Sequence, residues 1–224
     1  MTRTPLPNPR LILASGSPRR RELLTEAGYR FEVFVPDAAA ESGVYRGELP
    51  ADLVARLAYQ KAADVAARCP DALVIACDTV VECRGRILGK PRDRDDARDM
   101  LRQLRGSVHH VYSGLCLWQS PEHLATTRVA VTQLRMRSIS DELLEQYLGT
   151  GDWEGKAGAF GYQDRHDWLW IEAGSESNVV GLPLELLAEM LQNLGPIAAA
   201  VKKSYGGLCP PQRPVPGEHK LGGE

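Results

Sequence analysis

Short apolar runs alternate with amphipathic stretches along the first hundred residues of the chain. The runs at 11–14 and 72–77 predict buried strands, because continuous apolar segments of this length are typical of strands covered on both faces. Apolar residues recur every three or four positions from Pro50 to about Arg68, which is the period of an amphipathic helix. Strand and helix therefore alternate, as in an α/β protein.

The other elements are predicted from turn residues, helix caps and β-branched or aromatic enrichment. Further helices are expected at 18–27, 93–104, 141–148 and 183–194. Further strands are expected at 31–35, 80–83, 87–88, 107–118, 124–137 and 168–171. Because the two strands after residue 107 follow one another directly, through a turn at 120–122, the predicted sheet is mixed.

A strand, a small polar turn and a helix start follow one another near the N-terminus. The turn is 15–17, Ser17 is the expected N-cap, and Pro18 fits the first helical position. The free N–H groups of such a helix start suit an anion, and the arginines at 19–21 could add forked contacts to phosphate oxygens. An ordinary capped helix with a solvated basic face is the alternative.

Acids and lysines supply further candidate chemistry. Asp78 follows the most hydrophobic run of the chain, and open α/β sheets bind ligands at the carboxyl ends of their strands. A hairpin return should bring Lys90 near the level of Asp78, whereas Lys61 borders the buried stripe of its helix and either snorkels or enters a cleft. The long loop at 36–49 carries Glu41 and Glu48.

Composition limits the classes of function. The 224 residues carry a formal net charge of −2, which gives no reason to expect nucleic acid or an anionic membrane as a partner. Five scattered cysteines without a C-x-x-C pair indicate neither a disulfide framework nor a zinc site, and they fit a reduced cytoplasmic compartment. Neither a signal peptide nor a membrane span is evident. We expect one domain over 1–197 and a disordered tail over 198–224.

Two familiar phosphate-binding devices are excluded. The segment from Gly85 to Pro91 is one residue short of a P-loop and has proline where Ser or Thr must hold magnesium. No G-x-G-x-x-G follows a strand, and no G-x-S-x-G elbow is present. What remains is an anion-binding helix start, lysines and carboxylates, which are the requirements of metal-assisted phosphoanhydride hydrolysis.

Six ordered blocks together resemble the Maf-like nucleotide pyrophosphatases. The blocks are S-G-S-P-R-R at 15–20, A-R-L-A-x-x-K-A at 55–62, C-D-T-V-V at 77–81, G-K-P at 89–91, G-K-A-G-A-F-G-Y-Q at 155–163 and V-V-G-L-P-L at 179–184. The resemblance spans roughly residues 10–195. It implies a single α/β domain with a strongly twisted mixed sheet flanked by helices, as in Maf and inosine triphosphatase folds. It further implies hydrolysis of a nucleoside triphosphate to the monophosphate and pyrophosphate, and a homodimer.

The resemblance also implies roles for individual residues. The family's catalytic acid falls on Asp78, which should accept a proton from the attacking water, and its lysines that face the phosphates fall on Lys61 and Lys90. The acid of the loop falls on Glu41, about one residue from the simplest alignment, and would hold Mg or Mn together with Asp78. Positions that contact the phosphates or select the base fall on Ser15, Ser17, Arg19, Arg20, Thr79 and Gln163.

The residue after the acid distinguishes two subgroups of the family. Asp78-Thr79 resembles the enzymes that cleave dTTP and UTP, whereas D-Q is linked to 7-methyl-GTP. Cleavage of non-standard pyrimidine nucleotides would fit a role in cleaning the nucleotide pool. A non-catalytic nucleotide-binding regulator of cell division and a phosphatase that removes one phosphate at a time remain alternatives.

Overall fold

The computed structural model describes residues 10–120, 123–164 and 167–194. Its centre is a seven-stranded sheet in the order β2-β1-β3-β5-β6-β7, with β4 paired to β3. The strands are β1 (Arg10–Ala14), β2 (Glu32–Val33), β3 (Ala72–Cys83), β4 (Arg86–Leu88), β5 (Val108–Gln119), β6 (Leu124–Met136) and β7 (Leu169–Ala173). Strands β2, β1 and β3 are parallel, and the other pairs are antiparallel. The predicted single α/β domain with a mixed sheet is confirmed.

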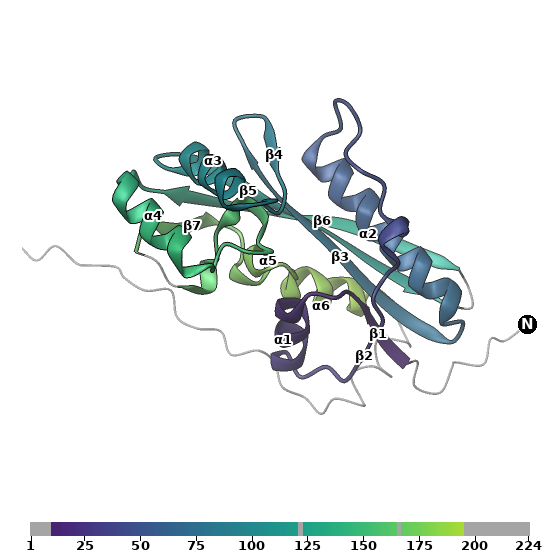
Figure 1. Ribbon diagram of the computed structural model, residues 1–224. Helices are drawn as coiled ribbons and strands as arrows, with labels where there is room; N and C mark the ends of the chain where they lie inside the picture. Colours follow the sequence, from purple (N-terminus) through teal and green to yellow (C-terminus); the bar gives the residue numbers. More distant parts are fainter. Residues whose placement is uncertain (1–9, 121–122, 165–166, 195–224) are drawn as a thin grey trace, which may run out of the picture.

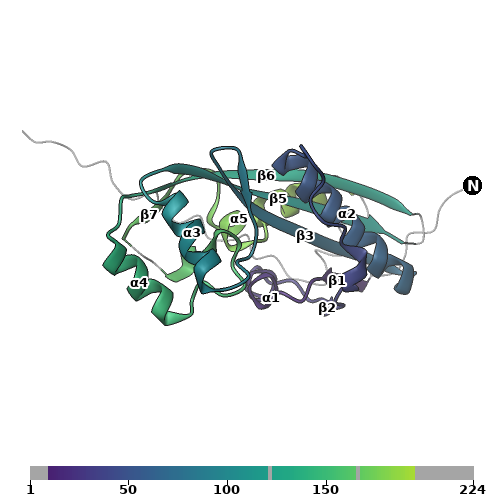
Figure 2. The same cartoon turned by 45° about the horizontal axis from the view of Figure 1, so that its top comes forward.

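Helices cover both faces of this sheet. They are α1 (Pro18–Glu26), α2 (Pro50–Arg68), α3 (Arg94–Leu104), α4 (Asp141–Thr150), α5 (Glu176–Val180) and α6 (Leu184–Gln192), with short 3-10 helices η1 (Ala38–Ala40), η2 (Ala157–Ala159) and η3 (Tyr162–Asp164). Figures 1 and 2 show α2 on one face and α1 with α6 on the other, while α3 and α4 lie toward the far end of the long strands.

The alternation of side chains along β1 explains how both faces are covered. Leu11 and Leu13 pack in the core that contains residues of α1 and α6, whereas Ile12 and Ala14 pack with residues of α2. A third core, built on α3, α4 and the far half of β3, lies beyond the end of β1. The long strand β3 therefore connects two lobes of the domain. The first lobe is built on β1, α1, α2 and α6, and the second on α3, α4 and η2.

Helix α2 approaches the sheet closely at Gly114 of β5. A Cβ atom built on this glycine would lie 2.1 Å from the carbonyl oxygen of Val54, so a side chain cannot fit there without moving the helix. The same helix carries Lys61, so this contact helps to place that lysine.

Three elements differ from the sequence predictions. The expected strand at 31–35 is only Glu32–Val33, which pairs with Ile12 and Leu13, and Phe34 adds one backbone hydrogen bond to the carbonyl oxygen of Leu13. The expected strands at 72–77 and 80–83 are one continuous strand, β3. Helix α5 was not predicted, because five residues between the cap Ser175 and the left-handed Gly181 are too few to show a helical period.

Some predictions fall outside the described residues. These are the centre of the turn at 121–122 and the tail over 198–224, so the domain boundary at 197 stays a prediction. Among the helices of the described ranges, none is both long and apolar enough to cross a lipid bilayer.

Candidate active site

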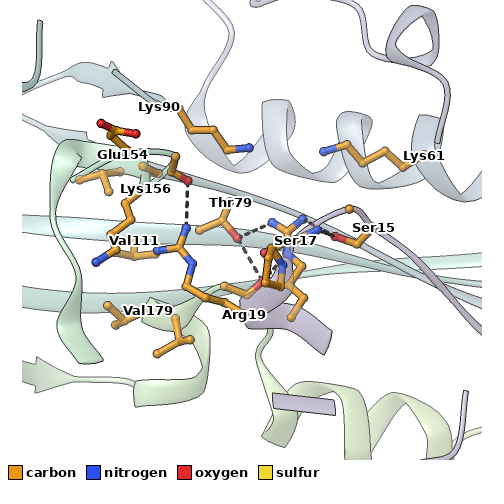
Figure 3. Close-up of a pocket in the computed structure, with 18 of the residues that line it drawn as sticks. Ser15, Ser17, Arg19, Lys61, Thr79, Lys90, Val111, Glu154, Lys156 and Val179 are labelled. Atoms are coloured by element: carbon orange, nitrogen blue, oxygen red, sulfur yellow. Dashed lines mark hydrogen bonds between the residues drawn. The ribbon is translucent and has the colours of Figure 1, made fainter. Parts of the chain in front are cut away.

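A cavity of about 600 Å³ lies where β3 outruns its parallel neighbour. The last pair between the two strands joins Ala14 to Ala76, whereas β3 continues to Cys83. From Cys77 to Val80 the flank of β3 is open on the β1 side, before β4 pairs with it from Val81 onward. On its other side β3 pairs with β5 as far as Glu82. The β1–α1 turn, the residues after β4, the η2 segment and the end of α5 close around the opening (Figure 3).

Asp78 lies two residues beyond the end of the parallel pairing. The expectation that it ends its strand is wrong, since β3 continues through it with Gly114 as its partner on β5. Ligand-binding edges of parallel sheets form at strand ends, and here β1 supplies that end. The side chain of Asp78 is 13% exposed, so the carboxylate is held at the margin of the core.

The turn at 15–17 leaves hydroxyl groups for a ligand. Ser17 is the N-cap of α1 and Pro18 follows as predicted, but the Ser17 side chain makes no capping hydrogen bond. Its backbone N–H instead donates to Oγ of Ser15 at 3.1 Å. Both serines line the cavity at the start of α1, where unpaired N–H groups and the helix dipole favour an anion.

Arg20 joins three segments of the cavity wall. Its Nε donates to the carbonyl oxygen of Gly181 at 2.8 Å, and its terminal nitrogens donate to Oγ1 of Thr79 at 3.2 Å and to Oγ of Ser15 at 3.4 Å. A guanidinium has five N–H donors, so donors remain for a ligand. Arg20 is therefore both a brace for the wall and a cation on its surface.

Arg19 closes the cavity from the other side of α1. One terminal nitrogen donates to the carbonyl oxygen of Gly155 at 2.9 Å and so connects the first lobe to the second (Figure 3). Burial lowers the pKa of Arg19, and the positive charge of Arg20 lowers it further. Arg21 is exposed and does not line the cavity, which separates it from its two neighbours.

Lys61 contacts two carboxylates, of which that of Glu41 lines the cavity and that of Asp78 lies just outside its lining. Its Nζ lies 2.6 Å from Oδ1 of Asp78 and 3.2 Å from Oε2 of Glu41. The side chain of Lys61 is 9% exposed, so the charge enters the cleft and does not snorkel to the solvent. Glu48, the other acid of the loop, instead pairs with Arg56 at 2.7 Å.

Lys90 faces Lys61 across the cavity, with the two ammonium groups pointing toward one another (Figure 3). The hairpin return places it as expected, because Leu88 pairs with Val81 and Lys90 lies two residues further on. Burial lowers the pKa of Lys90, and the nearby charges of Arg20 and Lys61 lower it further. This accumulation of positive charge is typical of a polyphosphate site.

The positions expected to select the base are only partly brought together. Thr79 lines the cavity, and its Oγ1 lies 2.9 Å from Oγ of Ser113. Gln163, in η3, is exposed and does not belong to the cavity wall.

Further residues of the wall were not singled out from the sequence. They include Glu154 and Lys156, together with the apolar side chains of Val111, Phe160 and Val179. Nζ of Lys156 lies 2.7 Å from Oδ2 of Asp164, and a Cβ on Gly161 would lie 2.3 Å from the same ammonium group. The sequence feature that could have indicated Lys156 is its position as the charged residue of the glycine-rich stretch at 155–161.

The carboxylates of Glu41 and Asp78 supply only part of the coordination that a hard divalent cation needs. Glu41 and Asp78 offer oxygen ligands on either side of one point, but no group of three or more His, Cys, Asp or Glu side chains able to hold a metal occurs among the described residues. Mg²⁺ is commonly held by one or two carboxylates with substrate phosphates completing its coordination. The donor set fits a metal shared with a phosphate ligand.

Comparisons with known proteins agree with this geometry. A family model described as "Maf-like protein" matches residues 10–194. A protein of Rhodopirellula baltica named dTTP/UTP pyrophosphatase is 53% identical over 189 residues, which are 84% of this chain and 83% of that protein. Proteins with the same name from Pelotomaculum thermopropionicum and Elusimicrobium minutum are each 42% identical, covering 83% of this chain and 96% and 99% of their own lengths.

Proposed function

This chain belongs to the Maf-like protein family, and we propose from that premise that it hydrolyses dTTP and UTP to the monophosphate and pyrophosphate. The observation that carries the proposal is the ion pair of Asp78 and Lys61 at the edge of a cavity lined by arginines and lysines. The name of the relatives, dTTP/UTP pyrophosphatase, supports the choice of substrates.

The cations of the cavity bind the triphosphate. Ser15, Ser17 and Arg20 form the first contact surface at the start of α1, and Lys61 and Lys90 flank the space opposite. Positive groups fixed in place before the reaction stabilise the charge that develops on phosphate oxygens, without reorganising during it. This arrangement orients the anhydride bond between the α and β phosphates.

Asp78 acts on the attacking water. Its carboxylate, which contacts Lys61 at 2.6 Å in this structure, accepts one proton as the water oxygen bonds to phosphorus. The bond to the bridging oxygen breaks, and one water is consumed for each monophosphate and pyrophosphate formed. Glu41 and Asp78 would hold the divalent cation, Mg²⁺ or Mn²⁺, which supplies charge neutralisation to the phosphates when bound.

The pyrimidine ring of the nucleotide lies toward the second lobe. Val111, Phe160 and Val179 provide an apolar surface there, and Arg19 and Thr79 provide donors at its border. We place the enzyme in the cytoplasm, because the four cysteines of the described ranges are free and buried.

Product identity tests the proposal. UTP incubated with the protein and Mg²⁺ should yield pyrophosphate and UMP in equal amounts, separated by phosphorus NMR or chromatography. Asp78→Asn should lower turnover about 10²- to 10⁴-fold, the usual contribution of a general base, with little change in nucleotide affinity. Orthophosphate and UDP as first products would identify a stepwise phosphatase. Tight binding with no product at all would identify a non-catalytic regulator.

A further inference from the structure

The ammonium group of Lys61 occupies the point between the two carboxylates expected to hold the metal. It contacts Asp78 at 2.6 Å and Glu41 at 3.2 Å. A monovalent ammonium and a divalent cation cannot share one point between the same oxygen atoms, because like charges at contact distance repel strongly. One of them must leave before the other can bind.

The surroundings disfavour a metal ion that enters alone. The cavity wall contains two carboxylates and five cationic side chains, those of Arg19, Arg20, Lys61, Lys90 and Lys156. One of these cations, Lys156, is already paired with Asp164. Even with Asp78 included, positive charge is in excess around this point. A triphosphate reverses that balance and offers oxygen atoms to the Lys61 ammonium, which already points into the cavity toward Lys90 (Figure 3).

We propose that Lys61 holds the metal position closed in the nucleotide-free protein, so that the divalent cation binds together with the triphosphate and not before it. The inference rests on the proposed function and specifies its substrate as the metal–nucleotide complex. In the bound state Lys61 turns from the carboxylates to the phosphates, and Glu41 and Asp78 become available to the metal. The 42% exposed side chain of Glu41 leaves room for this exchange.

Binding of Mn²⁺ to the full-length protein tests the order directly, because electron paramagnetic resonance reports the free ion without any turnover. The nucleotide is a UTP analogue with a methylene bridge between its α and β phosphates, and Mn²⁺ held by the analogue alone is measured separately. The wild-type protein should bind Mn²⁺ at least about ten-fold more tightly with the analogue than without it, the size of a coupling of about 1.4 kcal/mol. Equal affinity in both conditions would overturn the proposal.

Two methionine variants give the second arm of the test. Lys61→Met keeps the apolar stem but removes the ammonium, so it should bind Mn²⁺ without nucleotide at least about ten-fold more tightly than wild type, as expected for loss of a close charge pair. Lys90→Met removes a cation of the same cavity that forms no ion pair with either carboxylate in the described residues, and should change the affinity much less. An equal gain in both variants would refute a specific role of Lys61.

Different results would contradict the proposed pyrophosphatase function and the proposed order of metal binding. Absence of pyrophosphate release by the wild-type protein would contradict the proposed function, whatever the Mn²⁺ affinities are. Normal pyrophosphate release combined with tight Mn²⁺ binding to the nucleotide-free protein would leave the function standing and reject the metal order. If Lys61→Met did not fold, the comparison of wild-type protein with and without the analogue would still decide.

Discussion

Arg56 of α2 and Glu48 of the preceding loop form a forked ion pair, in which Nε and Nη2 each lie 2.7 Å from a different carboxylate oxygen. The same guanidinium donates to Oγ of Ser42 at 2.7 Å and to the carbonyl oxygen of Gly43 at 2.9 Å. The hydrogen bonds that Glu48 accepts from Arg56 and from the backbone N–H of Tyr45 lower the pKa of Glu48. Arg56 thus fixes the loop immediately after Glu41, five residues before Lys61 along the helix.

Arg56→Ala should weaken the metal dependence of the enzyme through Glu41. Outer partners of metal ligands commonly contribute about 10- to 100-fold in metal affinity, so the Mg²⁺ concentration for half-maximal activity should rise in that range. Turnover should recover at high Mg²⁺, because the catalytic groups themselves are unchanged. Arg56→Lys should recover only part of the effect, since an ammonium cannot form the fork.

The matched control for this prediction is Arg46→Ala. Arg46 lies in the same loop and is exposed, so its loss removes an equal charge without removing the brace. Kinetic titration of Mg²⁺ against the three variants and wild type is the measurement. A comparable shift for Arg46→Ala would show that the net charge of the loop, and not its position, sets the metal affinity.

The elements of the fold were largely accessible from the sequence. The amphipathic period over 50–68 and the apolar run that begins at Ala72 predict α2 and the start of β3 with their observed bounds. The sequence predicts that strand structure continues at 80–83, but a charged residue after six apolar ones resembles a strand end, so the place of Asp78 in the middle of β3 was not predicted. Only the position of β1, which stops at Ala14, explains why that charge is tolerated.

The sequence predicts which residues belong to the candidate site, but it does not predict which of them contact one another. The turn at 15–17 and Arg20 are close in sequence, so local structure brings them together. Lys61 and Asp78 meet because α2 packs on β3 and β5, and this packing depends on distant residues such as Gly114. The choice of Glu41 over Glu48 depends on Arg56, whose role no local pattern indicated.

Arg20→Ala should weaken UTP binding about ten- to a hundred-fold, the effect of losing a charged hydrogen bond worth roughly 1.5–3 kcal/mol. UMP binding should weaken much less, because the triphosphate supplies most of the charge. The ratio of the two losses is informative, since Arg20 also braces Gly181 and Thr79 and its removal loosens the wall for both ligands.

Calorimetric titration of UTP and UMP into wild type, Arg20→Ala, Arg20→Lys and Arg21→Ala measures this ratio. Arg20→Lys should be intermediate, because it keeps the charge without the fork. Arg21 is exposed beside the site and serves as the charge-matched control. Equal losses for UTP and UMP in Arg20→Ala would assign Arg20 a purely structural role.

His109 should make the stability of the fold sensitive to mild acid. Burial lowers the pKa of this histidine to about 4, and its ring lies edge-on to that of Phe160 with centroids 5.4 Å apart. In the unfolded chain His109 is protonated below about pH 6.5, whereas in the native state it stays neutral down to about pH 4. Its contribution to the free energy of unfolding is therefore fully present above pH 6.5 and is lost as the pH falls toward 4. Between pH 7.5 and pH 5 the loss from this residue is about 2 kcal/mol.

Urea unfolding at pH 7.5 and pH 5 tests this prediction. His109→Leu cannot titrate, so its free energy of unfolding should fall by about 2 kcal/mol less than that of wild type over the same interval. His110, the adjacent half-exposed residue that contacts Glu82 at 3.3 Å, provides the control variant His110→Gln. An unchanged pH dependence in His109→Leu would mean that this ring accepts a proton in the folded protein.

Gly114→Ala should destabilise the protein and impair the active site together. The added Cβ would lie 2.1 Å from the carbonyl oxygen of Val54 and 2.7 Å from the nitrogen of Ala55, both rigid backbone atoms of α2. Overpacking of this kind typically costs about 1–3 kcal/mol, so the free energy of unfolding should fall by that amount. Because α2 also carries Lys61, its displacement from β5 should lower kcat/KM for UTP even under conditions where the variant is fully folded.

Gly149→Ala separates this effect from the general consequences of replacing a glycine. Gly149 lies in α4, and a Cβ there meets no atom within 4 Å, so alanine should stabilise the helix by up to about 1 kcal/mol. Urea unfolding and UTP kinetics of both variants are the measurements. If Gly114→Ala retained wild-type stability, α2 could move away from β5 at no cost, and the position of Lys61 would not depend on this contact. If it lost stability but kept full kcat/KM, the contact would support the fold alone, and the Lys61–Asp78 pair would have to be positioned by the remainder of the α2–β3 interface.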